Sequence, residues 1–179
     1  GRMAVALVPG EEEKLEACMR DYGQAVKQLC FSYLKDYHLA EDATQDTFVK
    51  LFRAIQKGQL ANAASERAYV LRMALNVCHD LRRRAWFRRE DRHLSVENLP
   101  SLAAPPDSLR ELLFDLPVPH RVVLTLYYAH GMTMEEIAAV LHCSVTGVHR
   151  KLKAAQAALR QELTEGMEGG SIHETRFRE

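Results

Sequence analysis

Hydrophobic residues recur along this chain at three- and four-residue steps, which is the periodicity of helices with one buried face. The pattern predicts helices over about 11–35, 41–55, 66–89, 108–116 and 120–130, and two more after Gly131. Nowhere do apolar and polar residues alternate for long enough to indicate a β-strand. The chain is therefore predicted to be all-α.

One segment between these helices interrupts the periodicity. Residues 93–107 contain Pro100, Pro105 and Pro106 and hold no sustained apolar spacing, which is typical of a linker. We expect two small helical domains joined by this flexible linker: an N-terminal bundle over 11–92 and a C-terminal helix-turn-helix bundle over 108–165. The glycine-rich residues 166–179 are predicted to form a disordered tail.

Composition excludes some classes of protein. Hydrophobic residues make up 47% of the chain, but no apolar run approaches the roughly 20 residues of a membrane helix. We therefore expect a cytoplasmic protein. The 24 basic and 24 acidic residues cancel, which argues against indiscriminate binding of nucleic acid. The charges are separated along the chain, however, with arginines gathered at 82–92 and acids at 11–13 and 41–46, so one face can meet phosphate and another a protein.

The C-terminal half carries the pattern of a helix-turn-helix. Thr133 and Glu136 have the spacing of a capping box, and Ser144 can cap a following helix whose apolar stripe begins at Val145. Polar and basic residues occupy the exposed side of that helix: Thr146, His149, Arg150 and Lys153. Polar and basic side chains on the first turns of such a helix can contact base edges and phosphates in the DNA major groove. The alternative is an ordinary helical hairpin whose charges are solvated.

A second stripe lies on the helix predicted over 66–89. Tyr69, Arg72, Asn76, His79 and Arg83 recur on one side of it and lead into the arginines Arg82, Arg83 and Arg84. Arginines follow phosphates, while an aromatic ring and an amide can stack on and hydrogen-bond to an unstacked base. The alternative is a solvated helix end whose positive charge complements the helix dipole, with His79 merely part of that surface.

The helix predicted over 41–55 presents a mixed acidic and apolar surface. That surface consists of Asp42, Gln45, Asp46, Val49 and Phe52. It suits contact with another protein, although a bundle helix with a solvated acidic edge would look similar.

Several of these segments resemble the sigma-70 family of transcription initiation factors. Leu116-Pro117, Arg121-x-x-Leu124, the stretch 131–141 and Ser144–Val148 resemble the family's fourth conserved region, whereas 40–55 and Arg72-x-Ala74-x-Asn76 resemble its second. The resemblance implies minus-35 contacts by His149, Arg150, Lys151 and Lys153. It also implies minus-10 recognition and melting by the stripe on 66–89, with Asn76 near a flipped base.

The same resemblance implies what the chain binds. The 41–55 surface would dock on the clamp helices of the polymerase β′ subunit, and the C-terminal module would touch the β flap. The two matched regions without others indicate the extracytoplasmic-function (ECF) class, whose members are monomers held inactive by an anti-sigma partner, often anchored in the membrane. No cofactor is implied.

Two other functions are alternatives to this interpretation. A stand-alone dimeric helix-turn-helix regulator would bind duplex DNA tightly without polymerase. A helical enzyme using histidine and cysteine ligands has little support, since Cys18, Cys30, Cys78 and Cys143 are scattered and no H-x-x-x-H motif occurs. We therefore expect no metal site and no catalytic group.

Overall fold

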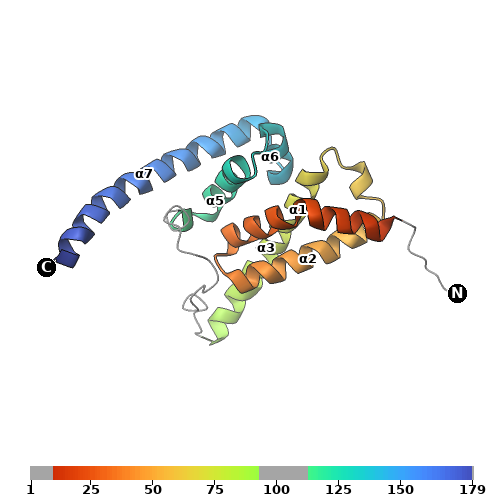
Figure 1. Cartoon of the computed structure of the whole chain (residues 1–179), viewed down its shortest axis with the longest axis horizontal. Helices are drawn as coiled ribbons and strands as arrows, with labels where there is room; N and C mark the ends of the chain where they lie inside the picture. Colours follow the sequence, from red (N-terminus) through yellow and green to blue (C-terminus); the bar gives the residue numbers. More distant parts are fainter. Residues whose placement is uncertain (1–9, 93–112, 179) are drawn as a thin grey trace.

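Three long helices form the N-terminal half of the chain. The computed structural model describes residues 10–92 and 113–178, with the backbone alone over 85–92 and 166–178. In the first part α1 (Glu11–Leu34), α2 (Tyr37–Gln56) and α3 (Glu66–Arg92) pack against one another, and a short 3-10 turn, η1 (Leu60–Asn62), joins the last two (Figure 1). The part of the chain from 10 to 92 contains no strand, as the apolar periodicity predicts.

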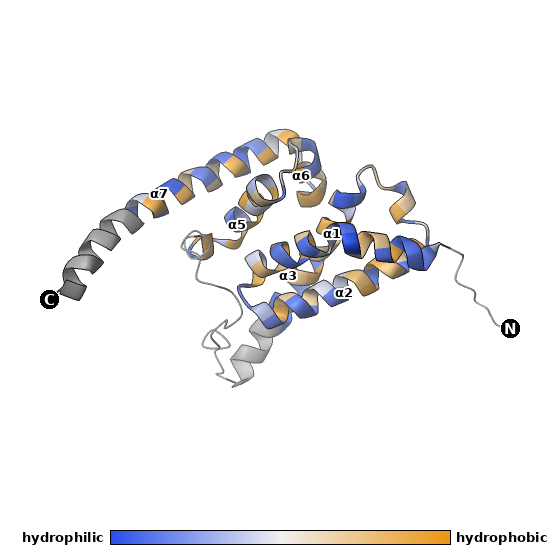
Figure 2. Cartoon of the chain, viewed as in Figure 1, coloured by the Kyte–Doolittle hydropathy of each residue, from blue (hydrophilic) through white to orange (hydrophobic). Residues whose placement is uncertain are grey.

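Shorter elements form the second half. α5 (Val118–Leu124) continues directly into a π-helical stretch, η3 (Thr125–Ala129), and is followed by α6 (Met134–Leu141) and α7 (Val145–Arg178). In Figure 1, α7 runs away from the remaining helices toward the C-terminus. The helices are amphipathic, and Figure 2 shows hydrophobic and hydrophilic residues interspersed along α1, α2 and α7.

Side-chain caps begin α3, α6 and α7, and the caps of α6 and α7 are those that the sequence predicts. The Ala68 amide donates to Ser65 Oγ at 3.2 Å at the start of α3, and the Gly147 amide donates to Ser144 Oγ at 3.0 Å at the start of α7. At α6 both hydrogen bonds of the capping box between Thr133 and Glu136 are present. Gly131 adopts φ +59°, the left-handed conformation that glycine reaches without steric cost.

Three boundaries differ from the sequence-based prediction. α2 begins at Tyr37 and not near residue 41, because Asp36 Oδ1 accepts from the Leu39 amide at 3.0 Å and caps the helix earlier. α5 begins at Val118, with Pro119 in its first turn, where no amide is needed. The tail predicted to be disordered continues α7 as far as Arg178, since an existing helix gains one hydrogen bond for each added residue.

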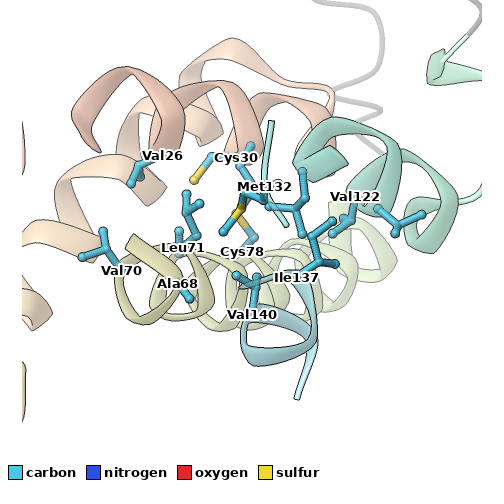
Figure 3. Packing of buried hydrophobic residues seen from close by; sticks show 14 of the residues in the cluster. Val26, Cys30, Ala68, Val70, Leu71, Cys78, Val122, Met132, Ile137 and Val140 are labelled. Atoms are coloured by element: carbon cyan, nitrogen blue, oxygen red, sulfur yellow. The ribbon is translucent and has the colours of Figure 1, made fainter. Parts of the chain in front are cut away.

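The predicted linker, 93–107, and the first five residues of the helix predicted over 108–116 lie outside the described residues. The two bundles on either side of that gap are packed together. Their buried side chains belong to one hydrophobic cluster, which includes Ile137 and Val140 of α6 and Cys78 and Leu71 of α3 (Figure 3). Within the described residues, therefore, the two halves share a core. No helix of this part of the chain is long and apolar enough to span a membrane.

Candidate nucleic-acid interface

The leading end of α7 presents the surface expected of a recognition helix. All five residues predicted to read duplex DNA have exposed side chains: Thr146, His149, Arg150, Lys151 and Lys153. The opposite side of the helix is buried through Val148, Leu152 and Ala155, and the helix packs on both α5 and α6. The structure thus brings the predicted basic and polar groups onto one free surface.

The turn between α6 and α7 is tight. His142 adopts φ +58° at the end of α6, and the Cys143 amide donates to the Ala138 carbonyl at 3.0 Å. Gly147 lies close to this turn, because a Cβ at its position would stand 3.3 Å from Ser144 Oγ. Close packing therefore favours glycine here even though its backbone is helical.

The predicted stripe on α3 divides into two parts. Asn76, His79, Arg82, Arg83 and Arg84 are exposed, as a nucleic-acid surface requires. Tyr69 and Arg72, nearer the start of the helix, are half-buried. The ring of Tyr69 packs against the hydrophobic cluster, so it offers less than a full face for stacking in this arrangement.

A tyrosine of α1 lies beneath the exposed part of the stripe. Tyr33 Oη is 3.3 Å from His79 Nδ1, and the guanidinium of Arg82 lies 5.9 Å from the centre of the Tyr33 ring. Burial raises the pKa of the Tyr33 hydroxyl, so it remains a neutral hydrogen-bonding group. Tyr33, which the sequence does not single out, therefore positions two of the predicted DNA-binding side chains.

The arginines at the end of the stripe are only weakly engaged within the chain. Arg83 Nη2 lies 3.5 Å from Asp80 Oδ1, and both side chains are largely in solvent. An exposed ion pair of this kind contributes at most about 1 kcal/mol. Arg83 can therefore exchange Asp80 for a phosphate at little energetic cost.

The front of the stripe contacts the second bundle. Arg72 hydrogen-bonds to His142 in the turn between α6 and α7. Five residues earlier, Arg67 pairs with Glu136 of α6, with Nη2 at 2.9 Å from both carboxylate oxygens. Sequence reasoning missed Arg67, since its partner is 69 residues away and only the folded chain brings the two together.

A buried arginine connects α5 to α1. Arg121 is 3% exposed, and its guanidinium donates to the carbonyls of Ser32 at 2.7 Å, Tyr33 at 2.9 Å and Leu116. Burial, with Arg82 nearby, lowers the pKa of Arg121 to about 10, so it stays charged at neutral pH.

The protein-binding surface predicted on α2 is also largely exposed to solvent. Asp42, Gln45, Asp46 and Val49 are exposed, the last with 53% of its area, while Phe52 is half-buried. Ala43 and Thr47 on the opposite side are fully buried, and the Thr47 hydroxyl donates to the Ala43 carbonyl at 2.6 Å. An apolar side chain among acids on a rigid helix suits docking of a protein with a basic and apolar surface.

Glu66 anchors the start of α3 to α1. Its carboxylate accepts from Lys14 Nζ at 2.6 Å and from the Tyr22 hydroxyl at 3.1 Å. The hydrogen bond from Lys14 is the main reason that the pKa of Glu66 is lowered, whereas burial raises the pKa of Tyr22 to about 12. The network keeps the base of the stripe in place.

The cysteines and other potential metal ligands form no metal-binding cluster in the parts of the chain that the structure describes. Over those residues, no three histidine, cysteine or acidic side chains are grouped so that they could hold a metal ion. Cys18, Cys30 and Cys78 are buried, and a hydrogen bond with Cys30 together with burial raises the pKa of Cys78. These thiols are core residues.

Comparison with known proteins agrees with this geometry. The family model described as Sigma-70 region 2 matches residues 18–88, and that described as Sigma-70, region 4 matches 107–159, so together they account for more than half of the chain. The ECF RNA polymerase sigma factor SigE of Mycolicibacterium smegmatis is 26% identical over 156 residues, and the match covers 81% of this chain and 60% of that protein. SigW of Bacillus subtilis is 23% identical, with 86% and 91% covered.

Two solved structures share the fold. CnrH in complex with the cytosolic domain of CnrY is 28% identical, with a TM-score of 0.65 over 86% of this chain and 90% of that one. The sigma factor RpoE of Bartonella quintana, in complex with the anti-sigma factor NepR, has a TM-score of 0.70 at 19% identity, covering 85% and 98%. With both regions matched in order and with ECF sigma factors among its relatives, the chain belongs to the extracytoplasmic-function group of the sigma-70 family.

Proposed function

We propose that this chain is a sigma factor that binds core RNA polymerase and directs initiation of transcription at specific promoters. The observation that carries the proposal is the distribution of surfaces over three helices: basic groups on α7, an amide-aromatic-arginine stripe on α3, and an acidic-apolar patch on α2. A duplex-binding regulator needs only the first of these.

The α7 surface is assigned to duplex DNA of the minus-35 element. Its basic side chains Arg150, Lys151 and Lys153 supply attraction to phosphate, and Thr146 and His149 can reach base edges in the major groove. The apolar side of the helix is buried and α7 packs on α5 and α6, so these groups can enter the groove without loss of core packing.

The α3 stripe is assigned to the minus-10 element after strand separation. Asn76 is exposed between Arg72 and the arginines at 82–84, so an unpaired base could reach its amide while the phosphates on either side meet guanidinium groups. A duplex would hide the base edges that such an amide reads, which is why the stripe suits melted DNA.

The α2 patch is assigned to the polymerase. Asp42, Gln45 and Asp46 offer charge and hydrogen bonds, and Val49 with Phe52 offers apolar area for the β′ clamp helices. The second bundle would lie near the β flap. The polymerase carries out the chemistry, so the role needs no catalytic group or cofactor in this chain.

An inhibitory partner is also proposed. The Bartonella quintana relative is bound to the anti-sigma factor NepR, and CnrH is bound to the cytosolic domain of CnrY. A protein of the same kind would hold this chain inactive in the bacterial cytoplasm, and a membrane anchor on that partner would localise both.

Promoter-directed transcription tests the proposal. The purified chain should co-purify with core RNA polymerase as a monomer and support run-off transcription from a subset of promoters in a genomic template pool. Polymerase alone serves as the control. Tight, dimeric binding to duplex DNA without polymerase, combined with no run-off product, would instead establish the stand-alone regulator.

A further inference from the structure

The two bundles of this chain hold each other through polar contacts as well as through the shared core. α6 of the second bundle packs on α3 of the first, and α5 of the second bundle packs on α1 of the first. Figure 3 shows the apolar part of this contact, with Met132, Ile137 and Val140 against the side chains of the first bundle.

Arg67 and Glu136 form the most complete of the polar contacts. Besides the two bonds from Nη2, Arg67 Nε donates to Glu136 Oε2 at 3.1 Å, and Nη1 donates to the His130 carbonyl at 3.1 Å. Both side chains are mostly covered, with 33% of Arg67 and 24% of Glu136 exposed. Bidentate charge-assisted bonds that are partly shielded from water are worth more than an exposed pair.

Arg121 supplies a second anchor. The carbonyls of Ser32 and Tyr33 belong to the last turn of α1, where carbonyls have no amide partner within the helix. The guanidinium of α5 satisfies them and places its positive charge at the negative end of the α1 dipole. The nearby hydrogen bond of 2.9 Å between the Ser32 and Thr125 hydroxyls adds to the same junction.

This packing affects the proposed surfaces unequally. Arg72, at the front of the α3 stripe, is engaged by His142 of the second bundle, next to the pair of Arg67 and Glu136, and Tyr69 is half-buried. The α2 patch and the α7 recognition surface remain exposed. Closure therefore covers part of the surface for melted DNA and leaves the polymerase-docking surface free.

We propose that the contacts of Arg67 with Glu136 and of Arg121 with the end of α1 form a latch, which closes the chain on itself without any inhibitor and blocks the front of the α3 stripe. Polymerase docks on α2 while the latch is closed, and DNA reaches the stripe only after the second bundle moves away. The proposal that the latch blocks DNA rests on the proposed function, whereas the proposal that the latch holds the two bundles together does not.

A double-mutant cycle on the full chain tests the latch. Glu136→Gln removes the charge but keeps a side-chain oxygen for the capping box, so α6 remains capped. Arg67→Gln removes the partner, and the double variant completes the cycle. Glu135→Gln, an exposed residue in the same turn of α6, is the matched control.

Single-molecule energy transfer between dyes on exposed Glu16 of α1 and Ala157 of α7, attached through unnatural amino acids, reports the closed and open populations. Each single variant should raise the open-to-closed ratio about five- to tenfold, and the double variant should add little further. The control should match the parent. The latch would be overturned if the unmutated chain were mainly in the open population, or if Glu136→Gln changed the open-to-closed ratio no more than Glu135→Gln does.

Binding of a labelled single-stranded minus-10 oligonucleotide by the same proteins tests the blocking role. Affinity should rise with the open population. Opening without any gain in affinity would overturn the blocking role while leaving the latch in place. Since neither readout contains polymerase, failure of run-off transcription would refute the proposed function alone.

Discussion

Arg121 Nε donates a 2.7 Å hydrogen bond to the carbonyl of Ser32, and in this way a residue of α5 caps the end of α1. The two residues are 89 positions apart. The contact is almost wholly shielded from water, with Arg121 only 3% exposed. The orientation of the second bundle on the first therefore depends in part on this guanidinium group.

Replacement of Arg121 by methionine should destabilise the packed chain. Methionine fills similar space but donates no hydrogen bond, so the carbonyls of Ser32, Tyr33 and Leu116 lose their partner. We expect the free energy of unfolding to fall by about 2–3 kcal/mol, measured by urea denaturation followed by circular dichroism. Arg160→Met, at an exposed site on α7, should leave the midpoint unchanged. Equal midpoints for the two variants would refute the anchor.

Reversal of charge on α2 should prevent binding to polymerase. Asp46→Arg combined with Gln45→Ala alters two exposed side chains and leaves Ala43 and Thr47 in the core, so the fold should persist. A pull-down with isolated β′ clamp helices measures the effect directly. Gln56→Ala, exposed at the end of the same helix, is the control. Undiminished binding by the double variant would show that the docking surface lies elsewhere.

Asn76 and Arg83 should affect promoters in different ways. Arg83→Ala removes a phosphate contact, so holoenzyme binding should weaken about equally on all promoters, with a salt dependence lower by roughly one phosphate. Asn76→Ala should spare the closed complex and alter preference at one minus-10 position by about 1–3 kcal/mol. Permanganate footprinting on promoters varied at each minus-10 base separates the two. A uniform loss for Asn76→Ala would contradict base reading.

Acid should open the chain through His130. Its Nε2 contacts the Ala25 carbonyl at 3.0 Å, and burial lowers the pKa of His130 from its usual 6.5, with Arg67 acting in the same direction. The separated state takes up the proton more readily, so the packed state loses stability as pH falls below about 6.5. Glu136, whose pKa is lowered, remains ionised there.

Energy transfer between the bundles at pH values from about 7.5 to about 5.5 measures this effect. His130→Gln retains an N–H donor near Ala25 but does not titrate, so its open population should respond less to acid than that of the parent. The difference between the two proteins isolates His130 from the other histidines. Identical profiles would exclude it as the titrating group.

Local features of the chain could be predicted from its sequence. Apolar spacing and capping residues such as Ser65, Thr133 and Ser144 act over one or two turns, so they predict helices and their starts without the rest of the fold. The exposed surfaces on α2 and α7 follow in the same way, because the buried side of a helix determines which residues face outward. Asp36 was missed as a cap, although its signal is equally local.

Long-range contacts were decided only by the tertiary structure. The pairing of Arg67 with Glu136 and the burial of Arg121 on α1 join residues many tens of positions apart, and no periodicity encodes such a partner. Arg72 illustrates the same point: helical spacing places it on the stripe with Asn76, yet His142 of the second bundle contacts Arg72, whereas Asn76 is exposed. A sequence pattern determines which side of a helix is polar, whereas the packing of other helices determines how much of that side remains open to DNA.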